Sequence, residues 1–290
     1  MTHSINRNLR LIFPQWQGGN NAPYYFGAHL LAWLAPPSPG AIVEIPVKPP
    51  TAESLENERG IVGRSQVVEQ LRHAREEIAE YRPDTIVTLG GDCLVSLAPF
   101  TWLLEKYGDK LGVLWIDSHP DVMTPAQYPH SHAHVLGALM GVGDSELTCS
   151  VKTPLSPDKV LIAGIHRPLE YEAQFIADHA IACCEPQAVR EGAQTVDEWI
   201  RREDIQYLAI HLDLDVLNPE LFRSVLFAKP GHGEHDFGDV AEGKLTMAEV
   251  VRLVNQAIAL AAPVGVTVAE HLPWDAINLK QMLAELPLMK

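Results

Sequence analysis

The chain has 290 residues, with 22 Lys and Arg against 37 Asp and Glu, and a formal net charge of −15. Its 47 % hydrophobic and 20 % charged residues are typical of a folded globular protein, which excludes a disordered or collagen-like chain. The acidic balance argues against binding along a nucleic-acid backbone or an anionic membrane surface. It suits a small cationic substrate, or a metal held by carboxylates.

No stretch of the sequence has the pattern of a targeting signal or of a membrane-spanning helix. The four cysteines, Cys93, Cys149, Cys183 and Cys184, do not have the spacing of a disulfide framework. We therefore expect a cytoplasmic protein with reduced thiols and without nucleic-acid or membrane partners.

Short apolar runs alternate with longer amphipathic stretches along most of the chain. In chain order, the predicted strands are Leu9–Phe13, Ala41–Ile45, Thr85–Leu89, Leu111–Ile116, Val160–Ile165, Tyr207–Leu214 and Val264–Ala269. The predicted helices include Gln66–Tyr81, Thr246–Ala261 and Asp275–Leu288. The strands are rich in Val, Ile and Leu with little polar alternation, as in strands covered on both faces. This alternation predicts an α/β fold in one domain, residues 1–290, with a mostly parallel sheet between helices.

Four of the predicted strands run directly into residues that carry chemistry. In sheets of this kind, ligands bind at the carboxyl ends of the strands. These strand ends read Gly90-Gly91-Asp92-Cys93, Asp117-Ser118-His119-Pro120-Asp121, His211-Leu212-Asp213-Leu214-Asp215 and Glu270-His271.

Two of these strand ends carry pairs of carboxylates. Asp117, His119 and Asp121 have the spacing that places side chains on one side of an extended backbone. Buried carboxylates on one face repel each other unless a cation lies among them. A lone Asp-x-Asp, such as Asp213 and Asp215, is more often a strand end capped by backbone N–H groups, but two such clusters favour a metal site. Oxygen and imidazole donors suit Mn²⁺, Mg²⁺, Fe²⁺ or Zn²⁺ rather than copper.

In this order the four motifs resemble the ureohydrolase superfamily, which includes arginase, agmatinase, guanidinobutyrase and formimidoylglutamase. The resemblance extends from Thr85 to Pro273. It implies a three-layer α/β/α fold, a binuclear manganese centre and a homo-oligomer, either a trimer or a hexamer. It also implies hydrolysis of a guanidino-type carbon–nitrogen bond, with release of urea or ammonia, by a hydroxide held between the two metals.

The resemblance also assigns roles to single residues. The metal ligands it implies are Cys93, Asp117, His119, Asp121, Asp213 and Asp215, with Asp117 and Asp213 bridging both ions. Asp121 completes the shell of one ion and counts with the catalytic residues, and Glu270 pairs with the guanidinium of the substrate. A proton-carrying histidine is expected at His134, 13 residues past Asp121, with His132 as an alternative at the substrate.

Three positions depart from the family pattern. Cys93 stands where the family has a metal-binding histidine. A thiolate there favours Zn²⁺ or Fe²⁺ over Mn²⁺, and a thiol that only packs would leave one ion weakly held. Arg167 lies where arginases have acidic residues for the substrate, which argues against arginine itself. Its guanidinium could face a substrate carboxylate, or it could be a surface residue. The loop Phe227–Asp236 also differs, and we expect it to border the pocket or to be solvated.

The sequence therefore predicts a metal-dependent hydrolase of a small guanidino or amidino compound. Two alternatives remain at this stage: a non-catalytic binding protein with a degraded metal centre, or a metal-dependent amide hydrolase on the same scaffold. Glu270 distinguishes a guanidino substrate from an amide, because only the first needs an anionic partner.

Overall fold

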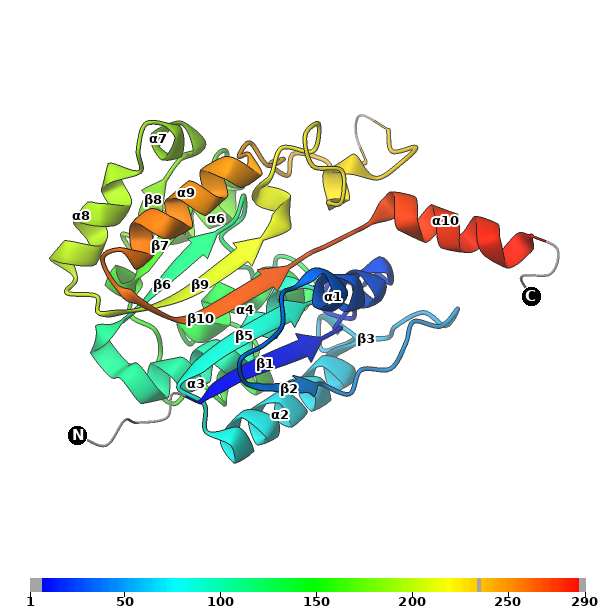
Figure 1. Ribbon diagram of the computed structural model, residues 1–290, viewed down its shortest axis with the longest axis horizontal. Coiled ribbons are helices and arrows are strands. Elements are labelled where there is room, and N and C mark those ends of the chain that lie inside the picture. Colours follow the sequence, from blue (N-terminus) through cyan, green and yellow to red (C-terminus); the bar gives the residue numbers. More distant parts are fainter. Residues whose placement is uncertain (1–6, 234–235, 287–290) are drawn as a thin grey trace.

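A computed structural model describes residues 7–233 and 236–286 of the chain and contains an eight-stranded sheet (Figure 1). Every pair of neighbouring strands in this sheet is parallel, in the order β2-β1-β5-β10-β9-β6-β7-β8. Its strands are β1 (Asn8–Phe13), β2 (Ala41–Glu44), β5 (Thr85–Gly90), β6 (Leu111–Ile116), β7 (Val160–Ala163), β8 (Ala182–Cys184), β9 (Tyr207–Asp213) and β10 (Ala262–Ala269). A small hairpin, β3 (Asn57–Glu58) and β4 (Ile61–Val62), pairs apart from it.

The four strands that end in the polar motifs are adjacent in the middle of the sheet, in the order β5-β10-β9-β6. Ile116 lies opposite Leu212, and Ala269 lies opposite Asp213. Because parallel strands end at the same edge, this register brings the residues after β5, β6, β9 and β10 together.

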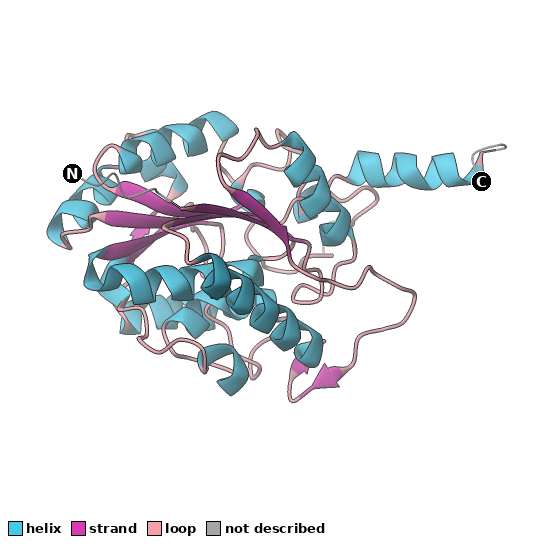
Figure 2. Cartoon of the chain, turned by 60° about the horizontal axis from the view of Figure 1, so that its bottom comes forward, coloured by secondary structure: helices cyan, strands magenta, loops and turns pink. Residues whose placement is uncertain are grey.

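Helices cover both faces of the sheet, which makes a three-layer α/β/α fold (Figure 2). Along β6, Val113 and Trp115 pack into one hydrophobic cluster and Leu114 and Ile116 into another, as the two-residue period of a strand requires. The first cluster includes the apolar faces of α2, α3 and α4, and the second those of α7, α8 and α9. The helices are α1 (Pro23–Leu34), α2 (Arg64–Tyr81), α3 (Leu97–Tyr107), α4 (Val135–Leu139), α5 (Ser145–Thr148), α6 (Glu170–Asp178), α7 (Pro186–Arg190), α8 (Gln194–Arg202), α9 (Met247–Ile258) and α10 (Trp274–Glu285). Short 3₁₀ turns are η1 (Cys93–Ser96), η2 (Gly108–Lys110), η3 (Ser131–His134), η4 (Pro157–Lys159), η5 (Leu214–Val216) and η6 (Leu226–Ala228).

The predicted strands are confirmed, with ends that differ by two residues or fewer. The start of α9 is as expected, because Thr246 accepts from Glu249 N and the Glu249 carboxylate accepts from Thr246 N. The helix predicted for Asp275–Leu288 is α10, and its last two predicted residues lie outside the described residues. β8 was not expected, because three residues are too short for a pattern to emerge.

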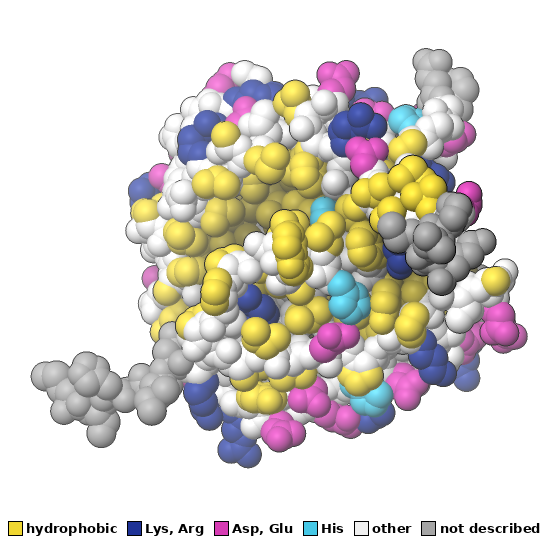
Figure 3. Space-filling model, turned by 45° about the vertical axis from the view of Figure 1, so that its right-hand side comes forward, with side chains coloured by type: hydrophobic (Ala, Val, Ile, Leu, Met, Phe, Trp, Pro, Cys, Tyr) yellow, Lys and Arg dark blue, Asp and Glu magenta, His cyan; other side chains and the backbone are white. Residues whose placement is uncertain are grey.

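The last helix, α10, extends away from the rest of the molecule in both ribbon views (Figures 1 and 2). Only Trp274 at its start is buried, in a cluster with Tyr24 of α1. Figure 3 brings this side forward and shows hydrophobic side chains over much of it. Leu279 and Met282 of α10 are about half exposed, and so is Leu34 of α1. In the part of the chain that the structure describes, no helix is long and apolar enough to cross a bilayer.

Candidate metal centre

The polar motifs after the four central strands meet at one edge of the sheet, but not by the geometry that their spacing suggested. The expected extended backbone over Asp117, His119 and Asp121 is wrong: β6 ends at Ile116, the chain bends at 117–119, and Asp121 has a φ of +50°. Asp213 is the last residue of β9, and Asp215 lies in η5. Turns, rather than strand periodicity, therefore aim these carboxylates.

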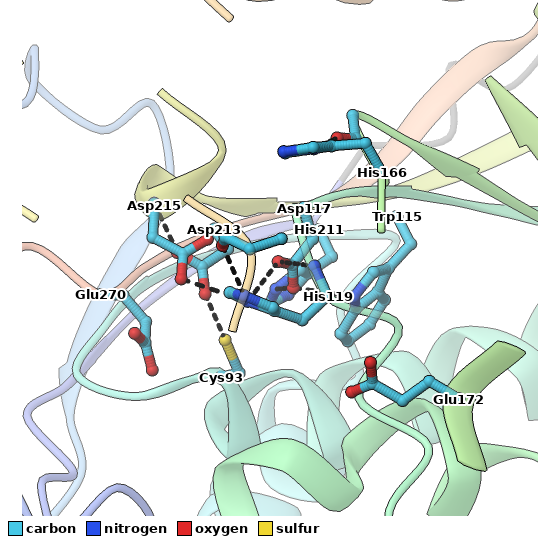
Figure 4. A network of polar contacts seen from close by, with 12 residues as sticks. Cys93, Trp115, Asp117, His119, His166, Glu172, His211, Asp213, Asp215 and Glu270 are labelled. Atoms are coloured by element: carbon cyan, nitrogen blue, oxygen red, sulfur yellow. Dashed lines mark hydrogen bonds and ion pairs between the residues drawn. The ribbon is translucent and has the colours of Figure 1, made fainter. Parts of the chain in front are cut away.

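Three groups of side chains have ligand atoms within 4.8 Å of one another, and they share members. The groups are Cys93, Asp117, Asp121 and His211; Cys93, Asp213 and Glu270; and Asp117, His119 and Asp215. In Figure 4 the carboxylates of Asp117, Asp213 and Asp215 and the ring of His119 point toward one another. All six residues expected as metal ligands thus belong to one connected cluster.

Hydrogen bonds orient the side chains at the centre of this cluster. The Cys93 thiol donates to Asp213 Oδ2 at 2.9 Å, and Asp215 N donates to Asp213 Oδ1 at 2.7 Å. His119 N donates to Asp117 Oδ1 at 2.7 Å, and Trp115 Nε1 to Asp117 Oδ2 at 3.1 Å. These four contacts fix the orientation of both carboxylates, and each of the four oxygens keeps a lone pair for a ligand.

The ring of His119 is held between the cluster and a loop. Its Nε2 lies 2.9 Å from Ala241 O, and its Nδ1 lies 3.4 Å from Asp117 Oδ1 and 3.3 Å from Asp215 Oδ2. Burial lowers the pKa of His119, but the carboxylates of Asp215 and Asp117 outweigh burial and hold this pKa well above 6.5. A metal ion at Nδ1 would take the place of that proton.

The cluster gathers more negative charge than its surroundings balance. The carboxylates of Asp117, Asp121, Asp213, Asp215 and Glu270 are at most 4 % exposed. Among residues 7–233 and 236–286, the side chains that form ion pairs with them are the imidazoles of His119 and His211, not Lys or Arg. Burial, followed by the neighbouring carboxylates, raises the pKa values of Asp121, Asp213 and Glu270 well above their usual range.

Several of the buried polar atoms in this cluster have no hydrogen-bond partner: Asp121 Oδ2, His211 Nε2, Asp215 Oδ1 and Glu270 Oε1. Leaving such atoms unpaired costs free energy, and divalent cations would satisfy them and balance the charge. The donor set therefore fits a centre of divalent metal ions.

Two of the residues in this cluster have unusual backbone conformations. Glu270 has a φ of +62°, and Asp121 one of +50°. This region is disfavoured for side chains other than Gly, Asn and Asp, so Glu270 stores strain at the site. The carbonyl of Gly91 accepts from Glu270 N at 2.7 Å, and this position requires a glycine, because a Cβ there would lie 1.6 Å from Gln15 O.

The cluster forms one wall of a cavity of about 340 Å³. This cavity, which we call the acidic cavity, is lined by His119, Asp121, Met123, Tyr128, His132, Ala133, Leu169, Glu172, Asp213, Asp215, Leu226, Phe227, Asp236, Phe237, Val240 and Glu270. Carboxylates and apolar side chains make up most of its lining, and no Lys or Arg is among the described residues that line it. Both interpretations of the loop Phe227–Asp236 hold in part: Phe227 and Asp236, at its two ends, line the cavity, whereas residues 229–233 are exposed.

The two histidines proposed for proton transfer lie in different surroundings. His132 lines the acidic cavity, with Nδ1 at 3.1 Å from Gly18 O. His134 is buried outside the lining, with Nε2 at 2.8 Å from Tyr128 O. Arg167 is exposed and is not one of the described residues that line the acidic cavity.

Sequence reasoning missed three residues at the site. Tyr24 of α1 donates to Glu270 Oε2 at 2.5 Å. Glu172 of α6 lines the acidic cavity and accepts from Leu169 N at 2.8 Å. His211 belongs to a ligand group although it lies within β9. Only His211 carried a signal, since an imidazole interrupts an otherwise apolar run two residues before Asp213.

The burial of His134 predicts a sensitivity to acid. Burial lowers its pKa from 6.5 to about 4, so its stabilising contribution is present above about pH 6.5 and is lost as pH falls toward about 4. His134→Gln, which can still donate to Tyr128 O, removes this titration. With a chelator present, the free energy of unfolding of the wild type should fall by about 2 kcal/mol relative to this variant between about pH 7.5 and pH 5. Urea unfolding at several pH values measures this difference. The prediction is wrong if the free energy of unfolding changes equally with pH in the wild type and in His134→Gln.

Comparison with known proteins identifies the family of this chain. The model of the arginase family matches residues 44–233. Arginase from Entamoeba histolytica is 31 % identical over 143 residues, which cover 47 % of this chain and 48 % of that protein. Arginase from Bacillus caldovelox is 30 % identical over 173 residues, 56 % of each chain. In these alignments the chain spans about half the length of the curated relatives it matches.

Solved structures extend the similarity of the fold to almost the whole chain. The crystal structure of Entamoeba histolytica arginase in complex with L-ornithine superposes with a TM-score of 0.76, at 20 % identity over 92 % of both chains. Formimidoylglutamase from Bacillus subtilis superposes with a TM-score of 0.66, at 13 % identity over 92 % of this chain and 79 % of that one. Because the family model matches about two thirds of the chain, the chain belongs to the arginase family, within the ureohydrolase superfamily.

Proposed function

We propose that this protein is a metal-dependent hydrolase of a small guanidino or amidino compound. The observation that carries the proposal is a cluster of five buried carboxylates at the wall of a cavity whose described lining contains no Lys or Arg. Such a cavity attracts cations and has room only for a small substrate. The expected ligands are Cys93, Asp117, His119, Asp121, Asp213 and Asp215. When bound, divalent cations supply Lewis acidity and lower the pKa of water toward neutrality.

In this proposal Glu270 holds the cationic end of the substrate. Its Oε1 has no hydrogen-bond partner, and the Tyr24 hydroxyl donates to its Oε2. A carboxylate with one free and one anchored oxygen can accept from a planar guanidinium or amidinium and fix its orientation. Arg167 is exposed and Leu169 is apolar, so neither offers a charge to the tail of the substrate. Glu172, which lines the acidic cavity, is a charged side chain that could contact this tail.

For proton transfer to the leaving amine we favour His132 over His134. The Nδ1–H of His132 is directed at Gly18 O, so its Nε2 is the nitrogen free to exchange protons in the acidic cavity. A positioned imidazole contributes about 10²–10⁴-fold to such reactions. His132→Gln should therefore lower kcat by at least about 100-fold. His134→Gln is the matched variant and should lower it by less than about 10-fold, measured with saturating substrate and metal. The reverse order would assign the proton transfer to His134.

The test of the function begins with the metal content of the protein as isolated, by inductively coupled plasma mass spectrometry. The metal-loaded protein is then given guanidino and amidino compounds with neutral, acidic and basic tails, alongside matched amides. Release of urea or ammonia that stops with a chelator supports the proposal. Hydrolysis restricted to amides would support the amide-hydrolase alternative, and a chain that holds no metal would support a binding protein.

Manganese, a cytoplasmic location and a trimeric or hexameric state remain predictions from the family resemblance. The exposed hydrophobic side chains of α1 and α10 offer a surface for self-association. Native mass spectrometry at several protein concentrations tests the oligomeric state.

A further inference from the structure

The ring of His211 occupies a fully buried position beside the cluster that the proposed function does not use. His211 lies two residues before Asp213 on β9, so both side chains emerge on the same face of the sheet. Its exposed fraction is 0 %. A buried imidazole in this position either completes a hydrogen-bonded core or serves the cluster, and its contacts distinguish the two.

Two neighbours hold the ring in one orientation. The indole of Trp115, opposite His211 in the sheet register, stacks on it with ring centroids 3.7 Å apart and planes 8° apart. Ser96 Oγ lies 2.8 Å from Nδ1. The stack on Trp115 holds the plane of the ring, and a flip within that plane would lose the contact of Nδ1 with Ser96, so Nε2 is the nitrogen that remains.

That second nitrogen has no hydrogen bond. His211 Nε2 is buried without a hydrogen-bond partner. The carboxylate oxygen that faces it, Asp117 Oδ2, is 3.9 Å away. This separation is too long for a hydrogen bond. It suits two ligands of one ion, because atoms that each lie about 2 Å from a metal are about 3–4 Å apart.

We propose that His211 is a metal ligand that supplies the imidazole which Cys93 cannot. Ligand atoms of His211, Cys93, Asp117 and Asp121 lie within 4.8 Å of one another. The second ion would use the group of Asp117, His119 and Asp215. Nitrogen and oxygen donors with a thiol in reach favour zinc or iron in the first position, whereas the second keeps only nitrogen and oxygen donors. This inference rests on the metal centre of the proposed function.

The first test compares metal binding, not activity. Wild type, His211→Asn and the double variant Cys93→His/His211→Asn are stripped with a chelator and titrated with Zn²⁺ by calorimetry. Removal of the contacts around a ligand already weakens metal binding by about 10–100-fold. His211→Asn should therefore lower the affinity for one of the two Zn²⁺ ions by at least about 100-fold. The double variant Cys93→His/His211→Asn should restore that affinity. His179→Asn is the matched control, because His179 also stacks on an aromatic ring and bonds through Nδ1.

A second measurement uses the wild type and does not depend on the folding of a variant. X-ray absorption of the protein loaded with two zinc ions counts imidazoles, and we expect two per chain, from His119 and His211. Two ions with a single imidazole, or unchanged affinities in His211→Asn, would overturn the inference and leave the proposed function intact. A wild type that binds no metal would overturn both.

Discussion

We expect Asp117→Asn to abolish hydrolysis and to remove both metal ions. Asp117 belongs to the group with Cys93, Asp121 and His211 as well as to the group with His119 and Asp215. Loss of about 4 kcal/mol of charge stabilisation corresponds to a decrease in kcat of about 10³-fold or more. Turnover of the active guanidino compound and metal content by mass spectrometry measure the two effects.

The same substitution should not unfold the metal-free protein. Burial raises the pKa of Asp117 to about 6, which means that its charged form is disfavoured where it lies. Removing one charge from a cluster of carboxylates relieves repulsion, which offsets the weaker hydrogen bonds from His119 N and Trp115 Nε1. In chelator, the urea midpoint of Asp117→Asn should equal or exceed that of wild type.

Asp144→Asn is the control variant, because it should lower stability without changing the metal content, the reverse of what we expect for Asp117→Asn. The carboxylate of Asp144 forms two hydrogen bonds of 3.0 Å with Arg64, and both side chains are about 10 % exposed. Breaking this buried ion pair should lower the free energy of unfolding by about 3–5 kcal/mol while the metal content stays at the wild-type value. If Asp117→Asn destabilised the metal-free protein as much as Asp144→Asn does, the cluster would be structural rather than a metal centre.

Glu270→Gln should have the second largest effect, and it should depend on the substrate. The amide of Gln keeps the shape of the side chain but loses the charge that pairs with a guanidinium or amidinium. Removing one partner of a buried charge pair costs about 2–5 kcal/mol, so kcat/KM for cationic substrates should fall by about 30- to 4,000-fold. Hydrolysis of a neutral amide of the same size should change by less than about 10-fold.

Two further variants help to interpret a loss of kcat/KM in Glu270→Gln. Tyr24→Phe removes the hydroxyl that holds Glu270 Oε2 and should lower kcat/KM in the same direction, by about 10-fold for one lost hydrogen bond to a charge. Glu172→Gln changes another buried carboxylate of the acidic cavity, outside the three ligand groups, and should act mainly on KM. Because Glu270 lies near Cys93 and Asp213, metal content is measured in each variant. Equal losses for guanidino and amide substrates would exclude a guanidinium contact at Glu270.

Much of the fold and of the ligand cluster was predictable because both depend on local pattern. The strands are short apolar runs, and a parallel sheet brings the residues that follow such runs to one edge. Asp117 and Asp213 could therefore be grouped although they are far apart in sequence, and β6 and β9 are indeed neighbours. The direction of each side chain was not predictable, since the turn that gives Asp121 a positive φ has no sequence signature of its own.

The residues that were missed depend on tertiary contacts. Tyr24 reaches Glu270 only because α1 packs beside the end of β10, across 246 positions of sequence. The imidazole of His211 interrupts an apolar run in the sequence, but only the contacts with Trp115 and Ser96 show that its Nε2 has no partner. His132 and His134 are two residues apart, and only the path of η3 decides which one lines the acidic cavity.

The central place of β10 in the sheet has a consequence for how the chain is made. Among the residues that the structure describes, β10 is the last strand in sequence, yet it lies between β5 and β9 and is the strand through which β2-β1-β5 joins β9-β6-β7-β8. A nascent chain on the ribosome must therefore keep two strand edges open until residue 269 has emerged, and such edges are prone to aggregation. Glu270 follows β10 directly, so the carboxylate for the substrate arrives in the same late event that closes the sheet.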